Sequence, residues 1–385
     1  MKVVHLITRL ILGGAQENTL LTVEDQHHLH GDEVTLITGP AIGPEGSLIE
    51  RANARGLDVR IIPALRRSIH PWRDWVSYRE IIRLLREILP EVVHTHSSKA
   101  GILGRAAASK LGIPCVHTIH GPAFHPFQSR VAYELFRAAE KWAARRCDRL
   151  VSVCDAMTEQ YVAAGVAPRD KFVTVYSGME VEPFLHPPRE RNTVRRELGF
   201  EPQHVVVGKV ARLFHLKGHE YVIEAARQVI AAQPEVRFLF VGDGVLRSAL
   251  QRQIEAAGLS SHFVFTGLVP NDRVPELIGA MDIVVHASLR EGLARVLPQG
   301  LISGKPVVSY DVDGAREVVI PNETGFLLPP KSVAELSQAL ITLVADPNLR
   351  ERFGQTGRAR FTDQFRHEVM TLRLREIYRQ LIDRR

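Results

Sequence analysis

The chain has 385 residues, of which 45% are hydrophobic and 24% are charged, and its formal net charge at neutral pH is +6. This composition is ordinary for a globular protein, and the length suits two domains. Three cysteines without CxxC spacing exclude a disulfide framework, and the lack of any run of roughly 18 apolar residues excludes a membrane-spanning helix.

Residues 1–14, MKVVHLITRLILGG, are apolar but are interrupted by His5, Thr8 and Arg9. They therefore indicate a strand that enters a glycine loop, and not a signal peptide. Segment 51–110 concentrates positive charge, with twelve Lys and Arg against five Asp and Glu. Such a face can attract nucleic acid, anionic lipid or phosphorylated small molecules, although a solvated surface is the commoner outcome.

Short, β-branched apolar runs alternate with segments of helical spacing. In the first half, strands are predicted over 3–8, 33–39, 59–64, 92–97, 114–121, 150–154 and 172–178. In the second half, they are predicted over 205–212, 236–244, 263–269, 282–288 and 306–312. Continuous apolar strands separated by helices are typical of parallel sheets covered on both faces. The chain is therefore predicted to be α/β, with two doubly wound, Rossmann-like domains.

A segment rich in proline and charge, 181–192, separates the two halves, and the stretch from His367 onwards predicts an amphipathic helix. In open parallel sheets, ligands bind outside the carboxyl ends of the strands. The chemistry is therefore expected in the loops that lead from a strand to the next helix.

The first such loop contains Gly13 and Gly14, which follow a strand and open a helix. Glycines there let the backbone approach an anion, and the helix N-terminus offers unpaired N–H groups. The spaced third glycine of the dinucleotide fingerprint is missing. A tight turn without a ligand is an equally good interpretation.

Four histidines lie close together in the first half. His94 and His96 are two apart on a strand and should face the same way. Lys99 lies in the loop that follows, and His120 ends the next strand. Their spacing fits no common zinc pattern, so no metal site is predicted. A polar wall with a histidine near a reacting group fits better, while a purely structural role is plausible for His94 and His117.

In the second half, Arg212 ends a strand and Lys217 stands just before a helix. Two fixed cations beside a strand end suit a diphosphate, because Arg binds it in a forked way and Lys as a point charge. The VGDG stretch, which contains Gly242, looks like the start of a dinucleotide fingerprint, but Arg247 replaces its third glycine. The DVD at 311–313 superficially matches a metal-nucleotide motif, yet a turn or capping role is favoured.

With these motifs the chain resembles the retaining glycosyltransferases of family 4, which have the two-domain GT-B fold. The resemblance is carried, in order, by the Gly13 loop, HTHSSKAGILGR, HTIHG, ARLFHLKG, VGDG, REGLARVLPQG and VDGAREVV. It implies an acceptor-binding domain at 1–188 and a nucleotide-sugar-binding domain at 189–365, which face each other across a cleft. It also implies a C-terminal helix at 366–385 that packs back on the first domain.

The resemblance implies roles for individual residues. Arg212 and Lys217 match the pair that grips the donor diphosphate, and Glu291 would hydrogen-bond the hydroxyls of the donor sugar. His120 matches a histidine beside that sugar and, with these three, forms the catalytic set. Other residues have donor-side roles as well. Gly13 and Gly14 would lie over the diphosphate, and the backbone N–H groups of residues 292–297, which include Gly292 and Leu293, would meet the phosphates. Gly242 is a further donor-side position, and Gln299 would lie at the ribose. The acceptor-side candidates are His96 and Lys99.

The family implies neither a catalytic metal nor a cofactor, because the nucleotide sugar is a substrate. The expected partners are that donor and a glycan, polyprenyl-linked or other small acceptor, without nucleic acid. Segment 72–88, with Trp72, Trp75 and several arginines, predicts a core-facing helix with a basic surface. The more specific hypothesis is that this helix contacts anionic lipid. The protein is expected in the cytoplasm, and this contact would place it at the inner face of the cell membrane. Polysaccharide or glycolipid assembly is the expected setting.

Other functions stay open. A nucleotide-sugar epimerase of the same fold would turn over without an acceptor, although the order of motifs disfavours it. A degenerate nucleotide-sugar-binding protein is a further alternative. Missing third glycines disfavour a nicotinamide dehydrogenase, and no recognition motif supports nucleic-acid binding.

The E-x7-E element begins with Glu291 but ends in Gln299. An amide oxygen accepts the hydrogen bonds of ribose hydroxyls without charge assistance. We expect donor binding to be modestly weaker and bond cleavage to be largely unchanged. The site is therefore interpreted as retuned and active.

Overall fold

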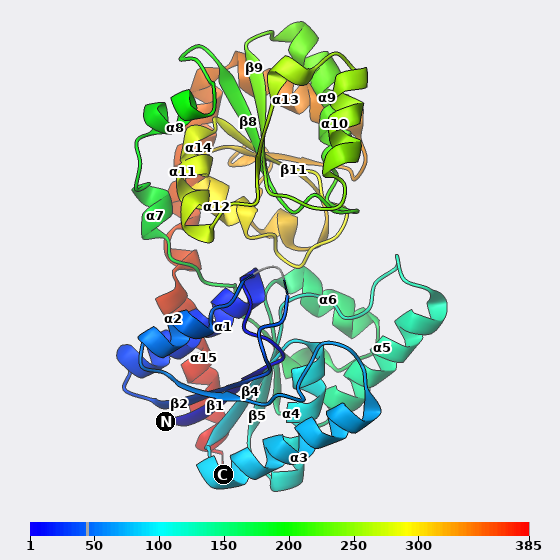
Figure 1. Ribbon diagram of the computed structural model, residues 1–385, viewed down its shortest axis with the longest axis vertical. Coiled ribbons are helices and arrows are strands. Elements are labelled where there is room, and N and C mark those ends of the chain that lie inside the picture. The colour runs from blue at the N-terminus through cyan, green and yellow to red at the C-terminus, as the bar shows by residue number, and fades with distance from the viewer. Residues whose placement is uncertain (44–45, 385) are drawn as a thin grey trace. The chain divides into compact units, whose positions relative to one another are not determined.

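The computed structural model describes residues 1–43 and 46–384, and the chain divides into two compact units (Figure 1). Unit 1 contains Met1–Met179 and Phe365–Arg385, and unit 2 contains Glu180–Gln364. Unit 2 thus begins before the predicted limit at 188, because helix α7 (Glu182–Leu185) packs on helices α11 and α12 of unit 2.

Unit 1 contains a parallel sheet, in which the described residues form seven strands in the order β3-β2-β1-β4-β5-β6-β7. After β1 the chain moves to one side of the sheet, and after β4 it moves to the other. The switch point, where ligands of this fold class bind, therefore lies between the carboxyl ends of β1 and β4. The strands are β1 (Lys2–Ile7), β2 (Glu33–Thr38), β3 (Asp58–Ile61), β4 (Val92–His96), β5 (Cys115–Ile119), β6 (Arg149–Ser152) and β7 (Phe172–Thr174).

The helices of unit 1 cover this sheet, and the last of them comes from the end of the chain (Figure 1). That helix packs against α1, and its Arg375 holds Asp32, which lies just before β2, through two hydrogen bonds of 2.7 and 2.9 Å. The predicted packing of the C-terminal helix on the first domain is confirmed. The helices are α1 (Gly14–His28), α2 (Ile49–Ala54), α3 (Pro71–Ile88), α4 (Ser98–Leu111), α5 (Arg130–Ala144), α6 (Asp155–Ala163) and α15 (His367–Ile382).

Unit 2 repeats the plan with a six-stranded parallel sheet, as far as the chain is described, in the order β10-β9-β8-β11-β12-β13. Its switch point lies between β8 and β11. The strands are β8 (Val205–Val210), β9 (Val236–Val241), β10 (Phe263–Gly267), β11 (Ile283–His286), β12 (Val307–Tyr310) and β13 (Gly325–Leu328). The helices are α7, α8 (Arg191–Glu197), α9 (His219–Ala232), α10 (Arg247–Ala256), α11 (Val274–Ala280), α12 (Val296–Ile302), α13 (Val333–Ala345) and α14 (Pro347–Phe361).

Strands such as β1, β4 and β9 are buried on both faces, as their continuous apolar runs predict, whereas the edge strand β3 is largely exposed. The parallel strand order of both sheets confirms the α/β, doubly wound fold. Among the strands of the described residues, β13 alone was not predicted. It is four residues long, and a Cβ at its Gly325 would lie 1.8 Å from the Val307 carbonyl oxygen. Among the described residues, none of the helices has the length and apolar character that crossing a bilayer requires.

Candidate functional site

The switch point of unit 2 carries the predicted cations and the predicted glutamate. Arg212 and Lys217 lie in the loop after β8, and Glu291 lies in the loop after β11. These two strands pair directly with each other at the centre of the sheet. The topology therefore brings together residues that are more than 70 positions apart in the sequence.

Lys217 and Glu291 form an ion pair, with 2.6 Å between the lysine Nζ and Oε1 of the glutamate. About a fifth of each side chain is exposed. The Nε2 atom of His286, on β11, lies 3.4 Å from the same carboxylate oxygen. Burial alone would raise the pKa of Glu291, but the hydrogen bond from His286 and the charge of Lys217 hold that pKa well below its usual range. Glu291 is thus ionised and acts as a hydrogen-bond acceptor.

The two loops that carry this pair pack directly on one another. Gly218 has a φ of 69°, and a Cβ there would lie 1.8 Å from the carbonyl oxygen of Ala287. The Leu289 amide also donates to the Leu216 carbonyl at 2.8 Å. Only glycine permits this approach, which seats Lys217 beside Glu291.

Arg212 is exposed, and its guanidinium carbon lies 5.0 Å from the centre of the Phe214 ring. Its loop rests on the VGDG turn. A Cβ at Gly242 would lie 2.3 Å from the Ala211 carbonyl oxygen, and the Leu213 amide donates to the Asp243 carbonyl at 2.9 Å. In this structure Gly242 therefore supports the backbone that presents Arg212.

Helix α12 begins at Val296, so most of residues 292–297, whose backbone N–H groups the resemblance assigns to the phosphates, lie in the loop before the helix. The Glu291 amide donates to Asp313 Oδ2 at 2.6 Å, and the Gly314 amide donates to the Gly292 carbonyl at 3.0 Å. These two hydrogen bonds hold Glu291 and Gly292 in the loop before the helix. Asp313 is the first residue of a short 3₁₀ helix, Asp313–Glu317, and its carboxylate accepts from a backbone amide.

Leu293 is buried, whereas Gly292 and Gln299 are half-buried, with Gln299 inside α12. Gln299 therefore lies on the same strand-to-helix connection as Glu291. The Gln299 amide donates a hydrogen bond to the Arg295 carbonyl at 3.1 Å, which places Gln299 one helical turn after Arg295.

A buried lysine beneath this site escaped the sequence reasoning. Lys209 lies on β8 with 1% of its surface exposed, and its Nζ has no hydrogen-bond partner among the described residues. Burial, and then the charge of Lys217, lower the pKa of Lys209 to about 7. A lysine inside an otherwise apolar strand was the signal that could have revealed it.

We predict that Lys209→Met stabilises the protein in a pH-dependent way. In the folded protein the pKa of Lys209 is about 7, which is below its value in the unfolded chain. Between these two pH values Lys209 binds a proton in the unfolded chain but not in the folded protein, which lowers the free energy of unfolding. This destabilisation grows as the pH falls and is complete below pH 7. The gain in unfolding free energy over the wild type should be small near pH 10.5 and reach roughly 2–5 kcal/mol at pH 6, at about 1.4 kcal/mol per pKa unit.

The tryptophans at 72, 75 and 142 all lie in unit 1, so tryptophan fluorescence would not follow the unfolding of unit 2, which contains Lys209. The gain is therefore measured by urea unfolding followed by circular dichroism. Lys331→Met is the matched control, because Lys331 is exposed in the same unit. A gain for Lys209→Met that does not change with pH would contradict the prediction.

The switch point of unit 1 carries the Gly13 loop. Gly13 precedes α1, which begins at Gly14, so the predicted strand, glycine loop and helix are confirmed. On the neighbouring strand end, the Ser97 hydroxyl lies 2.7 Å from that of Thr8. Lys99 lies in α4 and not in a loop, and its Nζ is 2.5 Å from Asp74 Oδ1. The ion pair ties Lys99 to α3.

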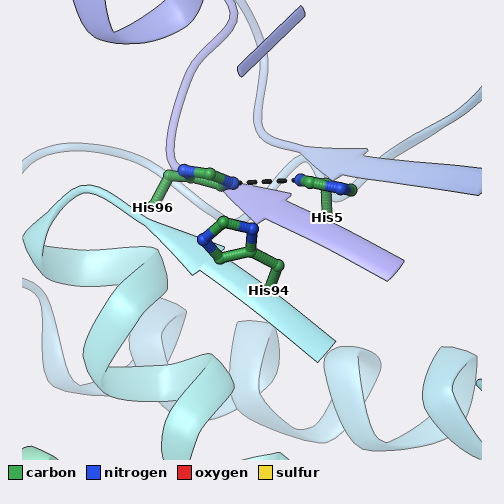
Figure 2. Close-up of side chains that lie close together, drawn as sticks. All are labelled: His5, His94 and His96. Carbon is green, nitrogen blue, oxygen red and sulfur yellow. Dashed lines mark hydrogen bonds between the residues drawn. The ribbon is translucent and has the colours of Figure 1, made fainter. Parts of the chain in front are cut away.

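The histidines of β4 face the same side of the sheet, as their spacing predicts. Figure 2 shows His94 and His96 beside His5 of β1. His5 Nδ1 is 3.0 Å from His96 Nε2, and His96 Nδ1 is 3.1 Å from His120 Nε2. His5 Nε2 lies 2.9 Å from the Gln26 side-chain oxygen. A buried chain of hydrogen bonds thus runs from α1 to His120.

His94 belongs to the same cluster but has other partners, Tyr378 of α15 at 2.5 Å and Thr118 at 2.7 Å. Nitrogen atoms of His5, His94 and His96 come within 4.8 Å of one another, which is close enough to share a metal ion. Every ring nitrogen of the three already lies within hydrogen-bonding distance of a protein group. The geometry therefore favours a hydrogen-bonded network over a metal centre.

His117, on the opposite face, packs against α4. A Cβ at Gly101 would lie 2.5 Å from the His117 ring, and His117 Nδ1 is 2.9 Å from the Thr95 hydroxyl. Burial lowers the pKa of His117 well below its usual value, so it is a neutral member of the protein interior.

Comparison with known proteins shows the family of the chain. Residues 190–360 match the family described as glycosyl transferases group 1, and residues 13–178 match the glycosyl transferase 4-like domain. The 2-deoxystreptamine N-acetyl-D-glucosaminyltransferase of Streptomyces fradiae is 30% identical, with 85% of each chain covered. An Escherichia coli galactosyltransferase, UDP-Gal:alpha-D-GlcNAc-diphosphoundecaprenol alpha-1,3-galactosyltransferase, is 29% identical over 74% of each chain.

Among solved structures, HepE of Anabaena in complex with UDP-glucose superimposes with a TM-score of 0.83. The two sequences are 21% identical, and the alignment covers 99% of this chain and 100% of that one. Likeness at this identity establishes the fold.

Proposed function

The chain belongs to the retaining glycosyltransferases of family 4, and on that premise we propose that Lys217, Arg212 and Glu291 hold the diphosphate and the sugar of its nucleotide-sugar donor. An enzyme of this family moves a sugar from a nucleoside diphosphate to an acceptor with retention at the anomeric carbon. The observation that carries the proposal is the Lys217–Glu291 pair at the switch point of unit 2.

The charges of this pair suit the two parts of a nucleotide sugar. During transfer the departing nucleoside diphosphate gains negative charge, which Lys217 and Arg212 stabilise as fixed cations. Glu291 is ionised, so it accepts hydrogen bonds from sugar hydroxyls and has no proton to give to the leaving group. Contact with the lysine orients the carboxylate before the donor arrives.

Retention follows from attack on the same face that the diphosphate leaves. The bond from the anomeric carbon to the phosphate oxygen breaks, and the bond to the acceptor oxygen forms. The departing phosphate takes the proton of the acceptor hydroxyl. The ionised state of Glu291 fits this route, because the reaction then needs no carboxylic acid from the protein.

A thermal-shift panel of UDP, GDP and ADP with the corresponding nucleotide sugars tests the proposal, since a ligand that binds only the folded state raises the melting temperature. One base should give a clear shift. Incubating the stabilising nucleotide sugar without an acceptor then separates the alternatives. An epimerase brings the nucleotide sugar to an equilibrium mixture of the two epimers, whereas a transferase releases sugar only slowly to water. A protein that binds no member of the panel would contradict the proposal.

We further propose that the acceptor is lipid-linked and is met at an anionic membrane surface. The E. coli relative acts on a diphosphoundecaprenol-linked sugar. On α3, Trp72 and Trp75 are 66% and 49% exposed and stack at 5.0 Å, and Arg79 lies over the Trp75 ring. The opposite face of α3 is buried. Exposed tryptophans beside arginine are typical of helices that lie at a membrane interface.

A groove of about 530 Å³ continues this surface across α4 to α5. It is lined by Trp75, Tyr78 and Trp142, with Lys110 and Arg146 among its polar groups. The Arg146 guanidinium lies 3.7 Å from the centre of the Trp142 ring. Aromatic rings with adjacent cations fit a lipid chain with an anionic headgroup.

Replacing Trp72 and Trp75 together by serine should weaken binding to vesicles that contain anionic phospholipid by roughly tenfold or more, because two interfacial side chains are lost. Co-sedimentation with vesicles measures the effect. Leu29→Ser is the matched control, because Leu29 is a 59% exposed apolar residue at the end of α1. Equal vesicle binding by the double variant and the wild type would contradict the proposal and indicate that α3 is a solvated helix.

A further inference from the structure

We propose that unit 2 contains a second anion site, at the amino edge of its sheet, where a doubly charged oxyanion such as a phosphate group binds Lys305, Arg358 and the hydroxyl of Ser303. None of the motifs that carry the resemblance includes these residues. The proposed donor site lies at the opposite, carboxyl edge of the same sheet. The two sites use different residues, so either can exist without the other.

A pocket of about 270 Å³ lies where several strands of unit 2 begin. The connection before β8, the end of α11 before β11 and the segment between α12 and β12 all contribute to its lining, and α14 contributes Arg358. Helices α8, α11, α12 and α14 lie together on one side of the sheet (Figure 1). The pocket is therefore built entirely within unit 2.

Positive charge predominates in this pocket. Its lining includes the cations Arg189, Arg191, Lys305 and Arg358 and one carboxylate, that of the exposed Glu190. Two of these cations already have carboxylate partners. Arg191 pairs with Asp282 at 2.6 Å, and Arg189 pairs with Glu197. The other two cations carry the charge that a ligand would neutralise.

Lys305 and Arg358 are these two cations. Within residues 1–43 and 46–384, no carboxylate lies within ion-pair distance of either side chain. Arg358 Nε donates to the Ile302 carbonyl at 3.0 Å, and a Cβ at Gly304 would lie 3.0 Å from Arg358 Nη2. The guanidinium is thus held beside the segment that carries Lys305. Two unpaired cations match the charge of a phosphate or sulfate dianion.

Ser303 supplies an independent sign of a ligand. It lines the same pocket and is 6% exposed, and its Oγ is buried without a hydrogen-bond partner among the described residues. Buried hydroxyls in folded proteins nearly always have a partner, because an unsatisfied one costs about 1–3 kcal/mol. An oxyanion in the pocket would accept the hydrogen bond that this hydroxyl can donate.

The charge state of Lys305 gives the site a measurable property. Burial, and then the charge of Arg191 on α8, lower the pKa of Lys305 to about 7. Arg358 of α14 and Arg195 of α8 act in the same direction, whereas Asp282, just before β11, opposes them. Lys305 is therefore largely neutral above pH 7 and must take up a proton to pair with an anion. Anion binding should weaken as the pH rises.

Isothermal titration calorimetry of the full chain with sodium sulfate at constant ionic strength tests this linkage, because sulfate itself does not titrate in the range used. Two buffers of different ionisation enthalpy report the protons exchanged. Binding should take up roughly 0.5–1 proton per chain at pH 8.5 and less than roughly 0.2 at pH 6. Affinity should fall by up to roughly tenfold between pH 7.5 and 8.5. Binding at pH 8.5 without proton uptake would overturn the proposal.

Two variants locate the anion. Lys305→Met should weaken sulfate binding at pH 6.5 by roughly tenfold or more and abolish the proton uptake, because the charged partner is lost. Ser303→Ala should weaken it by roughly threefold to tenfold, the scale of one hydrogen bond. Lys331→Met, which changes an exposed lysine of the same unit, is the matched control and should bind as the wild type does. Equal affinity of Lys305→Met and the wild type would overturn the proposal.

The Arg212→Ala, Lys217→Ala double variant separates this pocket from the proposed donor site. It should bind sulfate as the wild type does, even if it no longer binds nucleotide. Sulfate binding that is lost in the double variant but kept in Lys305→Met would place the anion at the donor site and contradict the inference.

Three probes distinguish the sources of the phosphate group. Inorganic phosphate, glucose 6-phosphate and vesicles with phosphatidic acid represent a free ion, a small phosphate ester and a lipid headgroup. Each is compared between the wild type and Lys305→Met. Binding of any probe that depends on Lys305 supports the site and identifies its source, whereas no such dependence with any of the three would refute it.

Discussion

Glu291→Ala should lower kcat for sugar transfer by roughly 10³, the upper part of the range for losing one group that stabilises a transition state. Two losses combine in this variant. The sugar hydroxyls lose an ionised acceptor, and Lys217 loses the partner that holds its Nζ at 2.6 Å. Steady-state transfer from the nucleotide sugar selected by the thermal-shift panel measures the effect.

Gln299→Glu is the matched control for this prediction, because it changes the other end of the same segment. Gln299 is assigned to the ribose, so adding a charge there should leave kcat near the wild-type value and keep or tighten donor binding. Near-normal turnover of Glu291→Ala would contradict the assignment. If activity appeared only in Gln299→Glu, the natural chain would be a degenerate binder.

Lys217→Ala and Arg212→Ala should each lower kcat by roughly 10²–10³, because each removes a cation from the departing diphosphate. Lys217 contacts Glu291, so the losses in Lys217→Ala and Glu291→Ala should not add in the double variant. Steady-state kinetics of the two single variants and the double variant measure this coupling.

Arg227→Ala is the control for the loss of a positive charge, since Arg227 is exposed on α9 of the same unit. It should behave as the wild type. Additive losses in the double variant would show that Lys217 and Glu291 work independently. Unchanged turnover in both Lys217→Ala and Arg212→Ala would contradict the assignment of the donor diphosphate to this site.

The strands and the loops that carry the site could be predicted from sequence because their signal is local. Runs such as VVHLIT and VRFLFV are buried on both sides, and the loops after them hold glycines and cations at fixed spacing. The rule that ligands lie at carboxyl ends then placed Lys217 and Glu291 in one region. The short β13 lacked such a run, and its Gly325 reflects a close backbone approach that no local pattern reveals.

Contacts between distant segments could not be predicted. The pairing of Lys217 with Glu291 depends on the fit of Gly218 against Ala287, which is a property of two packed loops. The connection of His5 to His96 depends on the parallel register of β1 and β4, and its anchor Gln26 comes from a helix. For the same reason Lys99 was assigned to a loop near the acceptor, whereas a contact with Asp74 of α3 holds it.

Titration calorimetry of UDP, GDP and ADP against the wild type and the Arg212→Ala, Lys217→Ala double variant tests the central claim most directly. The account predicts that one diphosphate binds the wild type at one site per chain, and that the double variant binds it at least roughly 100-fold more weakly, because two charge-assisted contacts are lost. Equal affinity of the wild type and the double variant for that diphosphate would contradict the account.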